Sequence, residues 1–335
     1  MTVVSMASLT RISDLRTKPY DIEPVDRSHW ASGDYVAGEV TGAPHRVYRI
    51  ELASGRMVLA LPGDHVIGAF GNRSATLEGV GGWADINGRK MNSMTSAGLF
   101  GCVTSMSRLI PPTLDLTYIG HVVRNGRKVC MSDFAMKESG GSFNVPTILL
   151  VGTSMSAGKT TTGRFVIHEL ERMGKYVVGA KLTGAGRYRD ILSFRDAGAH
   201  AVFDFVDGGL PSTVESESVF RNAIRPILHH IDSLHPDFLV AEAGASPLEP
   251  YNGTAAIDEL NDNIKCTILC ATDPYAVVGV EKAFGLRPDL VTGLATSTSA
   301  AIDLVSKLSG IEALNVLDPE CMPQLRRLLR RKLDI

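Results

Sequence analysis

The rhythm of hydrophobic and polar positions changes partway along the chain. In residues 31–136, short apolar runs alternate with polar residues, and turn residues interrupt them at short intervals. This pattern is typical of a compact β domain, either a barrel or a sandwich. The pairs Asn87-Gly88 and Asn125-Gly126 are the strongest candidates for hairpin turns within it, because both residue types tolerate positive φ.

Beyond residue 146 the apolar runs become continuous, and longer helical patterns separate them. The runs read TILLVG, YVVGAKL, AVFDFV, FLVAEA, CTILCA and LVTGLA, and the helical stretches include 159–173, 215–234 and 298–309. Buried strands that alternate with helices predict a parallel sheet covered on both faces, with right-handed crossovers. Ligands of such sheets bind at the carboxyl ends of the strands.

These patterns divide the 335 residues into four segments. We expect an N-terminal arm (1–30), a β-rich domain (31–136), a linker (137–146) and an α/β domain (147–335). The arm is mixed and polar, and it either packs on another part of the chain or is mobile. The linker clusters Gly, Ser, Asn and Pro between two differently patterned regions.

One glycine-rich segment follows the strand TILLV and opens a helix. GTSMSAGKTT fits the pattern G-x-x-x-x-G-K-[ST], in which backbone N–H groups and a helix N-terminus bind phosphates. Lys159 is expected to reach the β and γ phosphates, and Thr160 to ligate Mg²⁺. The residues expected to bind the nucleotide are Gly152, Thr153, Ser154, Met155, Ser156, Ala157, Gly158, Lys159, Thr160 and Thr161.

Two later strands end in chemically informative residues. KLTGAGRYRD begins with Lys181, and HPDFLVAEAGASPLEP delivers Glu242 followed by a turn. The order of P-loop, Lys-x-x-x-Gly and Glu-x-Gly-x resembles dethiobiotin synthetase over about residues 147–300. It resembles more closely a little-characterised P-loop family with an extra N-terminal domain, one member of which is implicated in N-acetylation of D-amino acids.

The resemblance implies a P-loop NTPase domain with a parallel sheet and helices on both faces, preceded by a smaller β-rich domain. It implies that Lys181 is a second catalytic lysine beside Lys159, and that Glu242 holds Mg²⁺. Asp190 matches a further acidic metal ligand, with Asp196 as the alternative. Carboxylates suit Mg²⁺, and a second ammonium can neutralise charge on a transferring phosphoryl group. The resemblance also implies a homodimer.

The remaining candidates lie in loops at the same edge of the sheet. Asp273 ends another strand and either touches the base or a substrate, or forms a plain turn. Arg187 and Arg189 could clamp a carboxylate or phosphate, or remain solvated. Thr183 and Gly244 belong to the loops expected to form the substrate pocket.

Charge, hydropathy and cysteine content indicate which classes of partner and which compartment to expect. The net charge of −2 and the pI near 6.5 give no global positive field, so we expect no nucleic acid partner. No apolar run reaches the length of roughly 18 to 20 residues that a membrane span needs, so no membrane is expected. Five scattered cysteines without a Cys-x-x-Cys pair suit a reducing cytoplasm.

Three classes of function use such a phosphate-binding loop. The reading we prefer is an ATP-dependent enzyme that phosphorylates a small-molecule carboxylate for attack by an amine, which is a ligase reaction. The alternatives are an N-acyltransferase of an amino acid or derivative, and an NTP-dependent switch that binds a protein partner. Thr153 stands where many switches carry an extra lysine, which favours an enzyme. GTP remains open beside ATP, although no guanine-specifying motif is present.

Overall fold

The structure is a computed structural model that describes residues 4–42, 49–137, 140–244 and 246–335. The chain forms two compact units. The first contains residues 1–137, 185–189 and 205–223, and the second contains residues 138–184, 190–204 and 224–335. Two short segments of the α/β region thus belong to the first unit, which a division by position along the chain does not anticipate.

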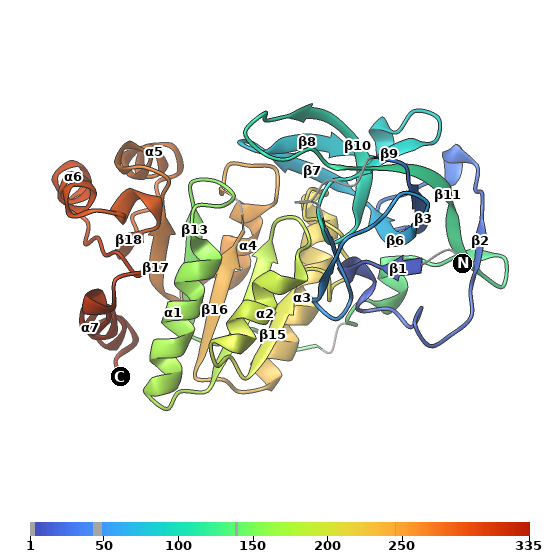
Figure 1. Ribbon diagram of the computed structural model, residues 1–335. Coiled ribbons are helices and arrows are strands. Elements are labelled where there is room, and N and C mark those ends of the chain that lie inside the picture. The colour runs from blue at the N-terminus through green and yellow to red at the C-terminus, as the bar shows by residue number, and fades with distance from the viewer. Residues whose placement is uncertain (1–3, 43–48, 138–139, 245) are drawn as a thin grey trace. The chain divides into compact units, whose positions relative to one another are not determined.

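The second unit is built on a six-stranded parallel sheet (Figure 1). Its order is β15-β14-β16-β13-β17-β18. The strands are β13 (Thr147–Gly152), β14 (Val177–Thr183), β15 (Ala201–Asp204), β16 (Phe238–Ala243), β17 (Ile264–Cys270) and β18 (Leu290–Thr292). Most of these strand residues are buried, as expected for strands covered on both faces.

The order of the strands determines which helices cover which face. The helices are α1 (Lys159–Arg172), α2 (Tyr188–Asp196), α3 (Glu217–Ser233), α4 (Gly253–Leu260), α5 (Pro274–Phe284), α6 (Ser299–Ser309) and α7 (Met322–Leu333). The chain moves one way along the sheet from β13 to β15 and the other way from β15 to β18. Right-handed crossovers therefore place α1 and α2 on one face, in front in Figure 1, and α3, α4 and α5 on the other. The α/β prediction with helices on both faces is confirmed.

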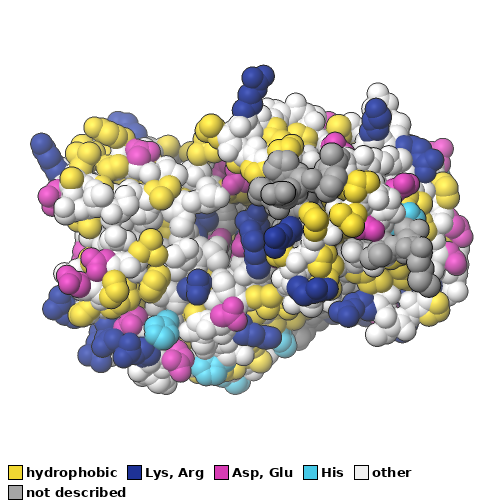
Figure 2. Space-filling model, in the orientation of Figure 1, with side chains coloured by type: hydrophobic (Ala, Val, Ile, Leu, Met, Phe, Trp, Pro, Cys, Tyr) yellow, Lys and Arg dark blue, Asp and Glu magenta, His cyan; other side chains and the backbone are white. Residues whose placement is uncertain are grey.

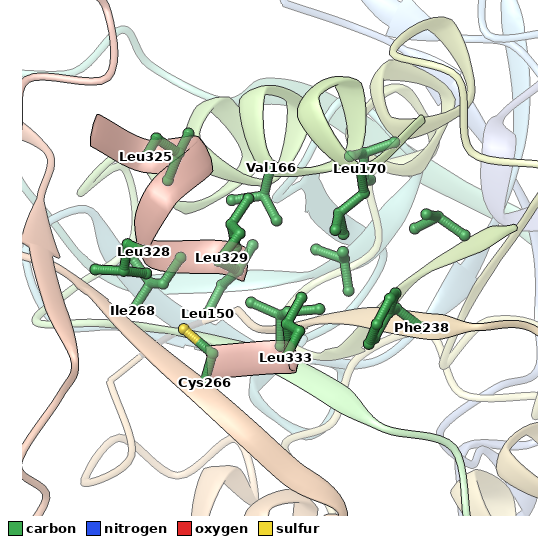
Figure 3. Close-up of a cluster of buried hydrophobic side chains, with 14 of the residues drawn as sticks. Leu150, Val166, Leu170, Phe238, Cys266, Ile268, Leu325, Leu328, Leu329 and Leu333 are labelled. Atoms are coloured by element: carbon green, nitrogen blue, oxygen red, sulfur yellow. The ribbon is translucent and has the colours of Figure 1, made fainter. Parts of the chain in front are cut away.

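The main apolar core of this unit lies under α1, α2 and α7. Figure 3 shows Val166 and Leu170 of α1 pointing toward the strands and toward the leucines of α7. The four buried leucines of α7 are Leu325, Leu328, Leu329 and Leu333. Three arginines of this helix, Arg327, Arg330 and Arg331, are exposed. Lys and Arg side chains gather over its position in Figure 2. The C-terminal segment is thus an amphipathic helix packed on its own domain.

A closed β sheet dominates the first unit. Strands β6, β3, β11, β9 and β10 pair in sequence, and a further pairing of β10 with β6 closes the ring, so these five strands form a small barrel. The strands are β1 (Val4–Met6), β2 (Asp21–Glu23), β3 (Tyr35–Val40), β4 (Ile50–Glu51), β5 (Met57–Val58), β6 (His65–Phe70), β7 (Asn72–Ala75), β8 (Gly79–Gly82), β9 (Lys90–Ser93), β10 (Leu99–Met106), β11 (Leu114–Arg124) and β12 (Arg127–Lys128). In the first unit, short 3-10 helices occur at Ser8–Thr10, Arg27–His29, Trp83–Asp85 and Met131–Phe134. In the second unit, they occur at Asn261–Asn263, Leu294–Thr296 and Pro319–Cys321.

Of the two hairpin turns predicted for this region, the structure contains one. Asn125-Gly126 joins the antiparallel pair β11 and β12, with φ of 52° and 71°, so this hairpin prediction is correct. Asn87-Gly88 instead connects a 3-10 helix to β9, which pairs with β10 and β11, so the second hairpin prediction is wrong. Residues 4–6 of the expected arm form β1 against β6. Among the described residues, no helix is both long enough and apolar enough to cross a bilayer.

Candidate functional site

The P-loop joins the end of β13 to the start of α1. Two of its residues have positive φ, Ser156 at 62° and Gly158 at 104°. A Cβ at Gly152 would lie 2.5 Å from Lys159 Nζ and 2.9 Å from its Cδ, so a larger residue there would displace the lysine from the end of the strand. Sequence and structure therefore agree on the reason for both glycines of the motif.

The lysine of the loop is buried at the carboxyl edge of the sheet. Lys159 Nζ donates a hydrogen bond to the carbonyl oxygen of Ser154 at 2.7 Å. Burial lowers the pKa of Lys159, and the nearby Glu242 carboxylate opposes this shift only in part. An anion bound in the loop would provide the compensation that a buried ammonium needs.

The first turn of α1 fits such an anion. The N-cap residue of α1 is Gly158, which has no side chain to cap the helix. The first four N–H groups of a helix also lack partners within the helix, and the positive end of the helix dipole lies beside them. The residues of the P-loop thus fit the phosphates of a nucleotide. The second unit has the P-loop NTPase fold.

Oxygen donors for a divalent cation meet beside the loop. Thr160 Oγ1 donates a hydrogen bond to Glu242 Oε2 at 2.9 Å, which brings the two predicted metal ligands together. Burial raises the pKa of Glu242, although the charges of Lys181 and Lys159 favour its ionised form. The described part of the chain holds no group of three or more His, Cys, Asp or Glu side chains arranged for a metal. The paired oxygens of Thr160 and Glu242 fit Mg²⁺ held otherwise by phosphate and water.

The second lysine lies on the strand next to Glu242. Lys181 on β14 pairs in register with Glu242 on β16 and with Asp204 on β15, so three charged residues form a row across adjacent strands. Lys181 is 7% exposed, and its Nζ lies 2.5 Å from Asp190 Oδ2 in the first turn of α2. Asp196, the alternative acidic residue, is exposed at the far end of the same helix. We name Lys159, Thr160, Lys181, Asp190 and Glu242 the site cluster.

Two glycines enclose the Lys181 side chain. A Cβ at Gly244 would collide with the carbonyl oxygen of Thr183 and lie 3.1 Å from Lys181 Cε, and a Cβ at Gly184 would lie 3.3 Å from the same atom. Thr183 is buried, and its hydroxyl has no hydrogen-bond partner among the described residues. An unsatisfied buried hydroxyl at a strand end is unusual and suits a ligand contact. The substrate roles of Thr183 and Gly244 stay predictions.

Neighbouring loops hold the rest of the P-loop in place. The Thr153 N–H donates to the Cys270 carbonyl oxygen at 3.1 Å, and Thr153 Oγ1 accepts a hydrogen bond from the Thr272 N–H at 3.1 Å. Asp273 caps helix α5 by accepting hydrogen bonds from the N–H groups of Tyr275 and Ala276 at 2.9 and 3.1 Å. Asp273 therefore caps α5, and its contact with a base or substrate stays a prediction.

The remaining predicted residues are more peripheral. Ser154 and Ala157 are buried within the loop, Met155 is half-buried, and Thr161 lies in the first turn of α1. Arg187 and Arg189 belong to the first compact unit, and Arg189 is exposed. Their role as an anion clamp stays a prediction.

Three residues at the site escaped the sequence analysis. Asp204 is almost fully buried at the end of β15, and Glu249 is close enough to Lys159 to oppose the lowering of that lysine's pKa. Gly293 has φ of 91°, and a Cβ there would collide with the Ala157 carbonyl oxygen of the P-loop. The acid inside the apolar run AVFDFV is a signal for Asp204, because Glu242 likewise interrupts the apolar run of its own strand.

Comparisons with known proteins add limited information. No family model matches the chain. No curated protein matches it either.

Several solved structures resemble part of the chain at low similarity. The signal recognition particle receptor FtsY from Elizabethkingia anophelis is 18% identical with a TM-score of 0.34, over 53% of this chain and 60% of that one. The hydrogenase maturation factor HypB from Archaeoglobus fulgidus is 12% identical with a TM-score of 0.36, over 57% and 91%. A DUF1611 family protein from Anabaena variabilis is 13% identical with a TM-score of 0.37, over 58% and 63%. The chain thus spans 60% of the FtsY chain that it matches. The reading of the site rests on its own geometry.

Proposed function

We propose that this protein is an ATP-dependent enzyme that transfers the γ-phosphoryl group to a carboxylate of a small molecule and then joins the activated acyl group to an amine. One observation carries the proposal. The site cluster places a second buried ammonium, that of Lys181, in register with the carboxylate that bonds Thr160. A loop that only retains a nucleotide needs one lysine, whereas phosphoryl transfer gains from a second positive charge beside the transferring group.

The roles of the residues follow from their positions. The N–H groups of the P-loop and Lys159 bind the phosphates, and Thr160 and Glu242 would hold Mg²⁺, which supplies charge neutralisation when bound. Lys181, held by Asp190, stabilises negative charge on the phosphoryl oxygens.

The reaction balances in two steps. A substrate carboxylate oxygen forms a bond to the γ phosphorus as the bond from that phosphorus to the β–γ bridging oxygen breaks, and ADP leaves. An amine nitrogen then bonds to the acyl carbon while phosphate leaves, and the amine loses a proton. Lys181 is best placed to act in the first step, because it is the phosphoryl group that carries the charge there.

A second candidate is an N-acyltransferase, in which the buried Glu242 carboxylate, bonded to Thr160 beside the P-loop, is the general base. Burial raises the pKa of this carboxyl, which brings it closer to the range of an effective general base. In this reading Glu242 takes the proton from the attacking amine, and the P-loop holds a phosphate of the acyl-carrying cofactor. The amine nitrogen bonds to the acyl carbon, and the thiol of the cofactor leaves with a proton.

The test compares wild type with Lys181→Ala during a screen of carboxylate and amine metabolites. We expect a substrate-stimulated release of ADP and phosphate, and a fall in kcat of about 100-fold or more in the variant with nucleotide Kd within a few-fold, because the lysine acts in the transition state. Lys307→Ala, at an exposed lysine of α6 in the same unit, is the control and should match wild type.

Two other outcomes would replace the proposal. Acyl transfer from an acyl-CoA without nucleotide turnover would support the acyltransferase. Hydrolysis that no small molecule stimulates, with protein-partner affinity that follows the nucleotide state, would support a switch.

Three further properties belong to the same proposal. We propose a homodimer, which light scattering at micromolar concentration would test by its mass. We propose ATP over GTP, which competition between the two nucleotides would test. We propose a cytoplasmic location, in which the buried thiols stay reduced; burial raises the pKa of Cys266 to about 12 and of Cys270 to about 11.

A further inference from the structure

Helix α2 begins on a buried carboxylate that comes from far away in the sequence. Glu51 on β4 is fully buried, and its two oxygens accept hydrogen bonds from the N–H groups of Tyr188 and Arg189 at 2.8 and 3.0 Å. All three residues belong to the first compact unit. Glu51 thus caps α2 across 137 and 138 positions of sequence.

A carboxylate is well suited to this position. The N–H groups of the first helical turn have no partners inside the helix, and the helix dipole favours negative charge there. Because two oxygens accept from two consecutive N–H groups, the cap fixes the direction of the helix axis as well as its starting residue. A single cap of the usual side-chain type satisfies these groups from a residue next to the helix.

Other contacts hold the same segment in the first unit. Ser8 Oγ donates a hydrogen bond to Glu51 Oε2, which orients the carboxylate. The Arg11 guanidinium lies 4.8 Å from the centre of the Tyr188 ring and bonds Asp207. The Gly186 N–H donates to the Pro211 carbonyl oxygen at 3.2 Å. The segment before Asp190 is therefore fixed from several directions.

The residue that follows this segment belongs to the site cluster. Asp190 is the third residue of α2, directly after the two capped N–H groups, and its carboxylate bonds Lys181 Nζ at 2.5 Å. A helix is stiff over one turn, so the start of α2 determines where the Asp190 carboxylate lies.

We propose that Glu51 is a positioning residue for Lys181, acting through the first turn of α2 and Asp190. This inference rests on the proposed function, because it assigns a kinetic role to the position of Lys181. Glu51→Gln keeps the size of the side chain but replaces one acceptor oxygen with an NH₂ donor, which opposes one of the two helical N–H groups.

The test measures wild type, Glu51→Gln and a matched control, Asp34→Asn, which removes a different buried carboxylate of the first unit that does not contact α2. We expect Glu51→Gln to lower kcat at least tenfold, leave nucleotide Kd within about twofold and increase hydrogen exchange in residues 190–196. Asp34→Asn should lower the melting temperature and leave kcat and that exchange unchanged. A loss of kcat in Asp34→Asn as large as in Glu51→Gln would overturn the inference, since general destabilisation would explain both.

A double-mutant cycle provides the second readout. If Glu51 acts through Asp190, then Glu51→Gln combined with Asp190→Asn should lower kcat little more than Asp190→Asn alone. Multiplicative losses of kcat would contradict the inference.

The nucleotide-induced shift of the wild-type melting temperature reports separately on the proposed function. If that shift is absent, the proposed function fails, and the exchange of residues 190–196 in Glu51→Gln still decides the cap. Exchange equal to wild type would overturn the cap, and faster exchange would support it.

Discussion

Each unit contains a buried group of charged side chains. The pKa of the buried carboxyl is lowered in one group and raised in the other. In the first unit Asp34 accepts hydrogen bonds from Lys128 Nζ at 2.6 Å and Cys130 Sγ at 3.1 Å, and His121 Nε2 lies 3.2 Å from it. The other ring nitrogen of His121 lies 2.6 Å from the Tyr118 hydroxyl. We name these five residues the Asp34 cluster.

The pKa values express the difference. Burial acts to raise the pKa of Asp34, but its hydrogen bonds to His121, Lys128 and Cys130 outweigh burial, and the pKa falls below its ordinary value. Burial also acts to raise the pKa of Glu242, and there the charges of Lys181 and Lys159 do not compensate. Hydrogen bonds outweigh burial at Asp34, whereas burial outweighs the neighbouring charges at Glu242 and Lys159 of the site cluster.

The comparison teaches how to separate structural from functional polar clusters in this protein. The Asp34 cluster has a histidine, a thiol and a carboxylate in contact, yet burial, followed by the effect of Asp34, raises the pKa of Cys130 to about 12, so the thiol is not activated. The site cluster lies beside the N-terminus of α1, whose N-cap residue is a glycine. Burial that the neighbouring charges do not offset, more than the residue types, marks the place where a ligand belongs.

The largest expected contrast is in stability. Asp34→Asn should lower the free energy of unfolding by about 3 kcal/mol, because it breaks a buried, hydrogen-bonded charge pair. Glu242→Gln should change it by less than about 1 kcal/mol or increase it, since it replaces a poorly compensated buried carboxylate. Urea unfolding of both variants measures the difference. Equal losses would mean that the two clusters are equally structural.

A smaller effect is expected where Gly293 supports the P-loop. Gly293→Ala would push a methyl group against the Ala157 carbonyl oxygen and should weaken nucleotide binding about tenfold, because the loop has to move. The control is Gly285→Ala, at a similar φ of 68° but with no atom within 4 Å of the added Cβ. It should cost about 1 kcal/mol of stability and leave nucleotide affinity unchanged. Titration calorimetry of both variants decides, and equal affinities would show that Gly293 does not shape the loop.

The smallest effect is on the pH dependence of stability. The folded pKa of Asp34 is below its ordinary 3.8, so its contribution is present above that pH and is lost as the pH falls through the folded pKa. The folded pKa of Glu242 is above its ordinary 4.5, so stability decreases as the pH rises from 4.5 through the folded pKa. Asp34→Asn should flatten the acid limb of the profile, and Glu242→Gln should flatten the decline above pH 4.5. Unchanged limbs in urea titrations across pH would contradict these assignments.

The sequence predicted the parts of the site that depend on local patterns. The P-loop, the helix from Lys159 and the strand ends at Lys181 and Glu242 lie where the alternation of strand and helix put them. These predictions succeeded because parallel strands bring their carboxyl ends to one edge of the sheet regardless of the loops between them.

The parts that depend on distant contacts were not predictable. The cap on α2 joins Glu51 to residues 137 and 138 positions later, and nothing local marks Glu51 as different from other acidic residues. Gly293 is needed because of the approach of Ala157, which only the fold reveals. The barrel strand β10 (Leu99–Met106), which pairs with β8 and with β9, was also not predicted from the sequence.

The most direct test of the account is calorimetry of Mg²⁺-ATP binding to wild type and Lys159→Ala, together with melting curves of both. We predict binding by wild type and, at about 100 times Kd, stabilisation of about 2.7 kcal/mol. Lys159→Ala should lose both while its unliganded melting temperature stays at or above that of wild type, because burial already lowers the pKa of Lys159. Equal nucleotide affinity of the two proteins would contradict the account.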